Sequence, residues 1–206
     1  MKEIREIGLE REVFLLRDGK IMEPSEYGFA YDEMGFLIEE RSEPWRHLNT
    51  IQMTLEMQHM LFEHRAKFFG MDLAMTPTML GSAEQVEYIA DKYKIRDFED
   101  YTKNIYGHKN SHHLGIFPAD DKDFYTLTAG IHVHFSSRTE HGRVVELPIE
   151  NIVEKMDEAF HEDIQRTGRL PGEWEPKTHG FEYRSLPCDM DILSVLQTAF
   201  KILRSV

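Results

Sequence analysis

Residues 124–137 read FYTLTAGIHVHFSS and carry the strongest β-strand signal in the chain. The stretch is rich in aromatic and β-branched residues, which favour extended structure. Side chains two positions apart point to the same face of a strand, so His132 and His134 project together. The remainder of the stretch is apolar enough for a central position in a sheet. We therefore predict a β-rich core strand that presents two imidazoles on one face.

A second β signal lies near the start of the chain, where residues 8–17 read GLEREVFLLR. Glu10 and Glu12 share a strand face by the same alternation, and RDGK, which follows at 17–20 with Gly19 in it, is typical of a hairpin turn. Another strand is predicted at 35–42, GFLIEERS, and ends before Pro44, which cannot donate to a sheet ladder. Together these segments predict an antiparallel start to a sheet.

Helices are predicted wherever apolar residues recur at helical spacing. They cover residues 49–69, 83–94, 149–168 and 189–203. Gly168 should end the third helix, and Asp189 or Asp191 could cap the fourth. Short strands are expected within 71–80, at 143–148 paired with the 124–137 strand, and at 179–187. This order of elements predicts an α+β fold, with a mainly antiparallel sheet covered by helices on one face.

The helix at 49–69 is expected to bury one apolar stripe. Its members are Ile51, Leu55, Met57, Leu61, Phe62 and Phe68. Three methionines in this helix, at positions 53, 57 and 60, could line a ligand groove, but flexible methionines more often fill gaps in a core. We assign them to core packing. The segment 103–123, rich in histidines and turn formers, is the expected active-site loop.

Length and composition set the class of protein. With 206 residues, 41% of them hydrophobic and 30% charged, the chain fits one globular domain, 1–206, alone or as a homo-oligomer. A formal charge of -13 argues against a nucleic-acid partner. The chain shows no apolar run of the ~20 residues that a bilayer span needs and no secretory signal, so we expect a cytoplasmic protein. Cys188 is the only cysteine, which excludes an internal disulfide and an all-cysteine zinc site.

Paired carboxylates on one strand face need a compensating charge. Glu10 and Glu12 would otherwise raise each other's pKa, and magnesium or manganese, which prefers oxygen ligands, is a natural partner. The alternative is a solvated face with Arg11 opposite. Likewise, His132 and His134 could contact a metal or a phosphate, or could simply be core histidines that bond to their neighbours.

Two further strands add polar residues. Within HGFEYRSLP, residues 179–187, Glu182 and Arg184 share a face, either as an ordinary salt bridge or as a carboxylate and a guanidinium that hold a metal-bridged phosphate. Glu39 supplies another carboxylate, although Glu40 and Glu43 are interchangeable candidates. Four strands that each present polar groups to one side predict a polar-lined sheet face.

In the order of these motifs the chain resembles the glutamine synthetase and glutamate–cysteine ligase superfamily, and especially its small carboxylate–amine ligases (amidoligases) of bacteria and bacteriophages. GLEREVFLL resembles the opening G-x-E-x-E strand, LIEERSEP the E-x-x-T/S-x-P strand, GIHVHFS the G-x-H-x-H strand and GFEYRSLP the E-x-R strand. The resemblance runs from about residue 8 to residue 188. It departs from the family where a basic residue is expected before E-x-R, because Glu175 stands there with only Lys177 nearby.

The resemblance implies a curved antiparallel sheet whose concave face binds ATP and two or more Mg²⁺ or Mn²⁺ ions, with helices packed on the convex face. The implied metal ligands are Glu10, Glu12, Glu39, His132 and Glu182. The implied nucleotide contacts are His132, His134, Lys177 and Arg184, and the implied catalytic residues are Glu12, Glu39 and Arg184. The chain is shorter than the well-known ligases, so substrate-side loops would be reduced or supplied by a neighbouring subunit.

The implied activity is ATP-dependent formation of an amide, with a γ-glutamyl bond among the candidates. The γ-phosphoryl group would pass to a small-molecule or peptide carboxylate, and an amine would attack the resulting acyl phosphate, in the host cytoplasm if a phage encodes the chain. No P-loop sequence is present, so metals and arginines, with Arg138, Arg143 and Arg169 as candidates, would hold the phosphates. The rival readings are a metal-dependent hydrolase or oxygenase with a His132, His134 and glutamate site, or a non-catalytic binding protein that retains the fold.

Overall fold

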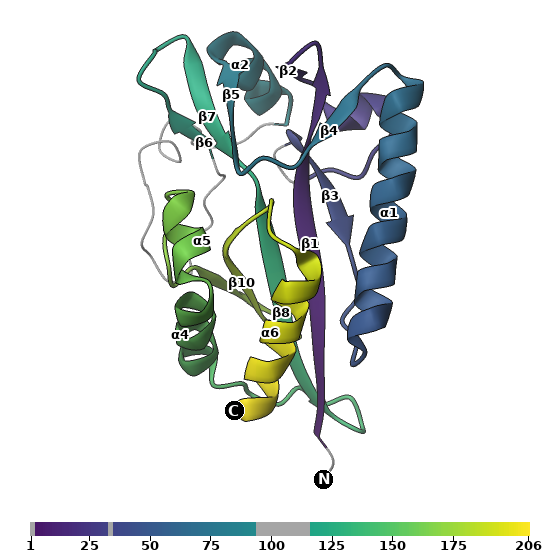
Figure 1. The fold of residues 1–206 in the computed structure, drawn as a ribbon, viewed down its shortest axis with the longest axis vertical. Coiled ribbons are helices and arrows are strands. Elements are labelled where there is room, and N and C mark those ends of the chain that lie inside the picture. Colours follow the sequence, from purple (N-terminus) through teal and green to yellow (C-terminus); the bar gives the residue numbers. More distant parts are fainter. Residues whose placement is uncertain (1–2, 33–34, 94–115) are drawn as a thin grey trace.

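The computed structural model describes residues 3–32, 35–93 and 116–206, and it has a mixed α/β fold built on a curled antiparallel sheet (Figure 1). In these ranges the elements are β1 (Glu3–Arg17), β2 (Lys20–Ile21), a 3₁₀ helix (Pro24–Tyr27), β3 (Leu37–Arg41), α1 (Leu48–Phe68), β4 (Asp72–Ala74), β5 (Thr78–Ser82), α2 (Ala83–Lys92), β6 (Ile116–Pro118), β7 (Phe124–Thr128), β8 (Gly130–Thr139), α4 (Ile149–Ala159), α5 (His161–Arg166), β9 (Trp174–Lys177), β10 (Gly180–Pro187) and α6 (Ile192–Ser205).

The long strand β1 organises the main sheet, in which the strands follow the order β2-β1-β8-β10-β9. β8 pairs with the first part of β1, from Glu3 to Arg11, and β3 pairs with it from Glu10 to Phe14. β4 also pairs with β1, and every pairing is antiparallel. The predicted hairpin turn is confirmed, because β1 returns into β2 through a two-residue turn at positions 18–19 with positive φ at both residues.

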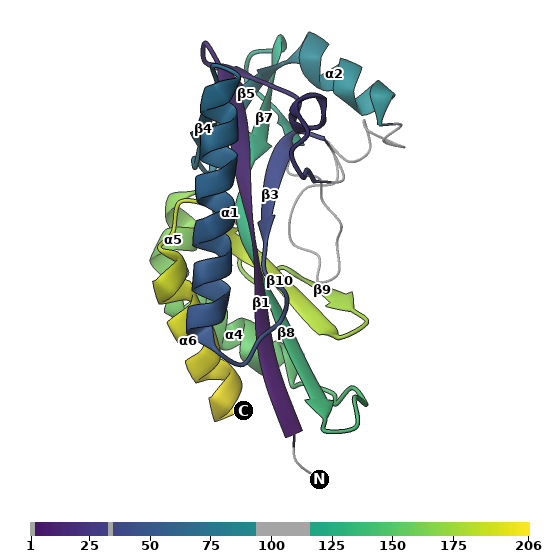
Figure 2. The ribbon, with the colours of Figure 1, turned by 90° about the vertical axis from the view of Figure 1, so that its right-hand side faces the viewer.

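Helices α1, α4, α5 and α6 lie on one side of the main sheet, and β9 and β10 curve away from them on the other side (Figure 2). These four helices therefore cover the convex face, whereas α2 packs against β5 and β7. Ile7, Leu9 and Val133 point from the sheet into this layer and are fully buried against helical residues such as Val195 and Leu196. Since alternate residues of the same strands face the opposite way, Glu10, His132 and His134 are left on the concave face. None of the described helices has the length and apolar character of a membrane span.

Three predicted elements differ from the structure. The 124–137 stretch is two strands, because β7 joins a separate small sheet, β5-β7-β6, while β8 joins the main one. The predicted strand at 143–148 is wrong, since only a single bridge joins Val144 to Arg138. The predicted helix at 149–168 is interrupted at Phe160, whose φ of -119° ends α4 before α5 begins. Asp191 is the cap of α6, and its side chain accepts a hydrogen bond from the Ser194 N–H.

The burial of α1 also corrects the sequence analysis. Of the predicted stripe, Ile51 and Leu55 are buried, but Met57, Leu61 and Phe68 are exposed. The assignment of the methionines to core packing is wrong, because the side chains at 53, 57 and 60 all face outward. The helix carries apolar residues on two opposite faces, and only one of them meets the sheet. Most of the predicted loop at 103–123 lies outside the described residues.

Candidate functional site

The polar positions of four adjacent strands meet on the concave face. β3 contributes Glu39, β1 contributes Glu10 and Glu12, β8 contributes the two histidines, and β10 contributes Glu182 and Arg184. The register places Glu10 beside His132, Glu12 beside Glu39, and Glu182 beside His134. The sheet thus brings together all the strand motifs that the sequence analysis singled out.

Glu10, His132 and Glu182 form the centre of this group. One potential ligand atom from each lies within 4.8 Å of the other two. His132 Nδ1 is 3.0 Å from Glu182 Oε1 and 3.8 Å from Glu10 Oε2, and His134 Nε2 is 3.3 Å from Glu10 Oε1. His132 and Glu182 are both buried. Three donors from three different strands therefore converge on one point.

Glu12 and Glu39 lie next to the centre with other partners. Glu12 Oε2 accepts a hydrogen bond of 2.6 Å from the Gly130 N–H, and its Oε1 is 3.7 Å from His132 Nε2. Glu39 is paired with Arg41, which also lies 3.4 Å from Glu10 Oε1. The structure thus separates the five predicted metal ligands into a central triad and two flanking carboxylates.

Basic residues from β9 and β10 close the other side of the triad. Lys177 Nζ is 2.7 Å from Glu182 Oε2 and 3.0 Å from Glu175 Oε2. Arg184 lies 2.9 Å from Glu175 and 3.6 Å from Glu182. Lys177 and Arg184, two of the four predicted nucleotide contacts, are therefore positioned at the site, where they are held by carboxylates.

The three central groups depend on one another electrostatically. Burial alone would raise the pKa of Glu10 and of Glu182, but contacts with His132 and His134, joined at Glu182 by Arg184, outweigh it and hold both pKa values below the ordinary range. Burial and the charge of Arg184 would lower the pKa of His132, but the charge of Glu12 and the contacts with Glu10 and Glu182 outweigh them and raise it to about 9. A protonated His132 therefore compensates these carboxylates together with Lys177, Arg184 and Arg41.

A divalent cation fits this donor set. Two carboxylates and one imidazole supply mainly oxygen ligands, which Mg²⁺ and Mn²⁺ prefer. A histidine must be neutral to bind a metal, so an ion that bound to His132 would displace its proton. The positive charge of the ion would then take over from that proton in balancing Glu10 and Glu182. Glu10, His132 and Glu182 are thus the residues that would hold the ion.

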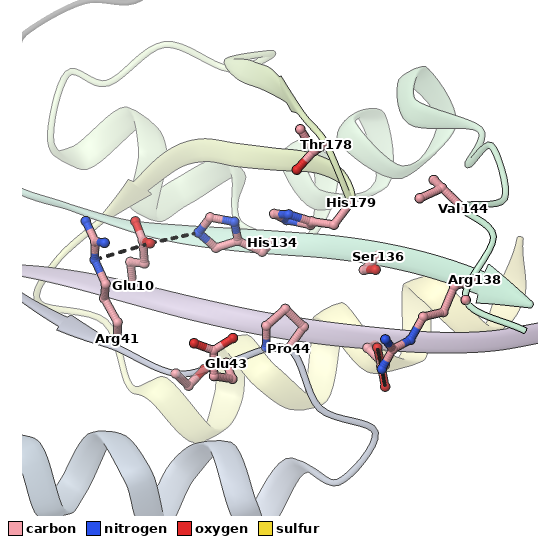
Figure 3. Close-up of a pocket in the computed structure, with 13 residues that line it drawn as sticks. Glu10, Arg41, Glu43, Pro44, His134, Ser136, Arg138, Val144, Thr178 and His179 are labelled. Atoms are coloured by element: carbon pink, nitrogen blue, oxygen red, sulfur yellow. Dashed lines mark hydrogen bonds and ion pairs between the residues drawn. The ribbon is translucent and has the colours of Figure 1, made fainter. Parts of the chain in front are cut away.

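A pocket of about 530 Å³ opens beside the triad (Figure 3). Its lining residues are Glu6, Glu10, Arg41, Ser42, Glu43, Pro44, His134, Ser136, Arg138, Gly142, Val144, Thr178 and His179. Glu10 and His134 belong to both the pocket and the polar cluster on the concave face, and Figure 3 shows Arg41 on the far side of Glu10. The pocket gives a small polar ligand direct access to Glu10, one of the two central carboxylates.

Several residues of this face were not predicted from the sequence. Arg41 follows Glu39 by two positions, so strand alternation could have placed it here, whereas His179 precedes β10 and gave no periodic signal. Of the three candidate phosphate arginines, Arg138 lines the pocket and pairs with Glu6, at 2.9 Å. Arg169 is buried and bonds to backbone carbonyls, and Arg143 is exposed.

Comparisons with known proteins add no relative, since neither the protein-family models nor the curated proteins give a match to this chain.

Asp32 is a further buried carboxyl near the site. Its Oδ1 accepts hydrogen bonds of 3.0 Å from the N–H groups of Phe36 and Leu37. Burial raises its pKa to about 7, and the negative charges of Glu12 and Glu39 add to the effect. Because this pKa lies above the ordinary value of 3.8, ionised Asp32 destabilises the fold. The stability associated with neutral Asp32 is fully present below pH 3.8 and is lost as the pH rises through about 7.

Replacement of Asp32 by asparagine should remove this pH dependence. The amide oxygen of the new side chain could still accept both N–H groups, but the side chain could not ionise. Asp32→Asn should therefore unfold at a higher temperature than the wild type at about pH 8, and the difference should shrink towards zero near about pH 4. Calorimetry in metal-free buffer would measure both values. An advantage of equal size at both pH values would contradict the assignment.

Proposed function

We propose that the protein is an ATP- and magnesium-dependent carboxylate–amine ligase that forms an amide bond. The observation that carries the proposal is the convergence of Glu10, His132 and Glu182 from three strands onto one point of the concave face. Basic side chains, Lys177 and Arg184, lie next to these oxygens. This pairing of metal ligands with phosphate-binding groups is what a phosphoryl-transfer site requires.

The fold supports the proposal at a coarser level. The resemblance implies a curved antiparallel sheet with a polar concave face and helices on the convex face, and the described chain has an arrangement of that kind (Figure 2). We propose further that this arrangement is a catalytic domain like that of glutamine synthetase. The lack of a P-loop sequence agrees with phosphates bound through metal and basic side chains.

In the proposed reaction a substrate carboxylate oxygen attacks the γ-phosphorus of ATP, and the bond to the bridging oxygen of ADP breaks. An amine then attacks the acyl carbon, phosphate leaves, and the amine loses a proton. The bound divalent ion would neutralise charge on the phosphate oxygens. Arg184 and Lys177 stabilise the negative charge that develops on the transferred group, and Glu10, His132 and Glu182 hold the ion. The pocket beside Glu10 would receive the carboxylate or the amine.

Nucleotide binding provides the first test. The wild-type chain should bind a non-hydrolysable ATP analogue in the presence of Mg²⁺ or Mn²⁺, with little binding once the metal is chelated, as measured by calorimetry. With ATP, release of ADP and phosphate should require both a carboxylate and an amine, which a substrate screen would identify.

The alternative function is that of a metal-dependent hydrolase or oxygenase. A hydrolase or oxygenase would use a His-His-carboxylate set around zinc or iron. Among the described residues, the three-residue group contains one histidine, and His134 contacts Glu10 from outside it. Tight zinc binding without any nucleotide binding would refute the ligase proposal and favour this competitor.

A further inference from the structure

Strand β10 contains a β-bulge at the candidate functional site. Its register with β8 shifts by one residue between Tyr183 and Leu186. Arg184 and Ser185 of β10 therefore stand opposite a single residue of β8, His132. Because of the extra residue, Tyr183 and Leu186 both reach the main hydrophobic core although they are three positions apart. Bulges re-aim side chains and are common next to active sites. The direction of the Arg184 side chain thus depends on what holds the bulge.

The buried side chain of Arg169 holds this bulge. Its Nη2 donates to the carbonyl oxygen of Arg184 at 2.9 Å, and its Nε donates to that of Ser185 at 3.2 Å. Its Nη1 donates to the carbonyl oxygen of Ala129, the residue before β8, at 3.3 Å. A guanidinium is planar and presents its donors in a fixed fork. One rigid group therefore ties the bulge of β10 to the start of β8.

The end of α5 fixes the backbone from which Arg169 extends. Gly168 has a left-handed φ of 68°, and its N–H donates to the carbonyl oxygen of Gln165 at 3.1 Å. The N–H of Arg169 donates to the carbonyl oxygen of Ile164 at 3.1 Å. These two bonds around a left-handed glycine form a Schellman motif. Since Ile164 is buried in the main core, the Arg169 side chain starts from a rigid point on the helical side of the sheet (Figure 2).

The contact with Ala129 also orients a hydrogen bond inside the site. The carbonyl group of Ala129 and the N–H of Gly130 belong to one planar peptide unit, so they point in opposite directions. With the carbonyl held by Arg169, the Gly130 N–H is directed at Oε2 of Glu12, to which it donates at 2.6 Å. An ideal Cβ at position 130 would lie only 2.8 Å from Nη2 of Arg169. Glycine is therefore needed there for the guanidinium to fit.

The segment that leads into β9 holds the other side of the bulge. The N–H of Arg184 donates to the carbonyl oxygen of Glu173 at 3.0 Å, and the N–H of Glu173 donates to Ser185 Oγ at 3.1 Å. The guanidinium of Arg184 meets Glu175 at 2.9 Å and Glu182 at 3.6 Å. Arg184 is thus fixed at its backbone and at its charged end. A group held in this way loses little freedom when it binds a phosphate.

We propose that Arg169 is a positioning residue of the candidate site. It fixes the bulge of β10 and the peptide unit before β8, and so aims the Arg184 guanidinium and the Gly130 N–H. Arg169 bonds to backbone oxygens and acts only through these other groups. The inference rests on the proposed function in one respect, namely that Arg184 contacts a phosphate. It assigns a role to a buried cation that the proposed reaction does not use.

Amide hydrogen exchange, followed by NMR, tests the positioning without any nucleotide. Arg169→Lys keeps the charge, but a single ammonium group cannot meet three carbonyl oxygens in the arrangement of the guanidinium. The N–H groups of Gly130 and Arg184 should then exchange at least about tenfold faster, because local opening becomes easier. The N–H of Phe135, further along β8, should keep its rate. Arg166→Lys, an exposed substitution on α5, is the matched control and should leave all three rates unchanged.

A double-mutant cycle separates positioning from a merely structural role. Calorimetry would measure the affinity for a non-hydrolysable ATP analogue in the presence of Mn²⁺. Arg169→Lys should weaken binding by about tenfold or more in the wild-type background. It should weaken binding by less than about threefold when Arg184→Gln is already present, because both changes then remove the same contact. An equal factor in the two backgrounds would show that Arg169 does not act through Arg184, and would overturn the proposal.

The two experiments distinguish the possible failures. A wild type that binds no nucleotide would refute the ligase proposal, whereas the exchange rates would still decide the positioning role. Unchanged exchange of the Gly130 and Arg184 N–H groups in Arg169→Lys would overturn that role, whatever the nucleotide result. Circular dichroism would show that the variants are folded. If Arg169→Lys is not folded, Gly130→Ala replaces it, because the added Cβ displaces the same guanidinium. Wild-type exchange of the Arg184 N–H in Gly130→Ala would equally overturn the proposal.

Discussion

The double variant Glu10→Gln/Glu182→Gln should bind Mn²⁺ at least about 100-fold more weakly than the wild type, since loss of outer contacts alone costs roughly 10- to 100-fold at metal sites. Both substitutions keep the size of the side chain but remove a charged oxygen donor from the triad. Calorimetry in metal-depleted buffer would measure the affinities. Glu154→Gln, an exposed substitution on α4, is the matched control and should bind as the wild type does.

Glu39→Gln tests whether the ion lies at the triad or closer to β3. Glu39 is paired with Arg41, and burial, reinforced by Glu10 and Glu12 and opposed by Arg41, raises its pKa to about 7. We therefore expect it to contribute less to a first bound ion than the triad does, with a loss of less than about tenfold. An equal loss in Glu39→Gln and the double variant would show that the ion lies closer to β3. No loss in the double variant would refute the metal site.

The second large effect concerns stability. Glu40→Ala should lower the free energy of unfolding by about 3–5 kcal/mol, because it leaves the charge of Arg11 buried without a partner. Glu40 is fully buried between the sheet and α1. Its Oε2 accepts bonds from Arg11, at 2.7 Å from Nε, and its Oε1 lies 2.6 Å from His59 Nδ1. Urea denaturation would measure the loss.

Two further variants test whether the loss of stability comes from breaking the buried Arg11–Glu40 pair or only from truncating a side chain. Glu43→Ala, at an exposed position close by, should change stability by less than about 0.5 kcal/mol. Arg11→Met/Glu40→Leu, which removes both charges, should be more stable than Glu40→Ala, since apolar replacement of a whole buried ion pair is often tolerated. A Glu40→Ala variant as stable as Glu43→Ala would contradict the role of this pair.

Much of the site could be predicted because strand alternation is a local property. Residues two apart share a strand face, so Glu10 with Glu12, and Glu182 with Arg184, were grouped correctly without any knowledge of the fold. The β1–β2 turn was equally readable, since few residue pairs tolerate positive φ at both positions. His179 could not be found in this way, because it lies just before a strand and follows no period.

Local rules fail where two faces look alike. α1 has apolar residues on both of its faces, so its period predicted a helix but could not tell which side meets the sheet. The stretch at 124–137 is continuous in β propensity, yet its two halves belong to different sheets. In both cases the deciding contacts come from residues distant in the sequence.

By itself the sequence determined the antiparallel pairing of the first strands, the positions of most helices, and which side chains share a strand face, because turn geometry and side-chain periodicity act over a few residues. Only the tertiary structure decided that Glu39 faces the site while Glu40 is buried with Arg11. It also selected the triad from the five candidate ligands. The reason is that the register between strands, and the side on which the helices pack, depend on the whole core and not on any single segment.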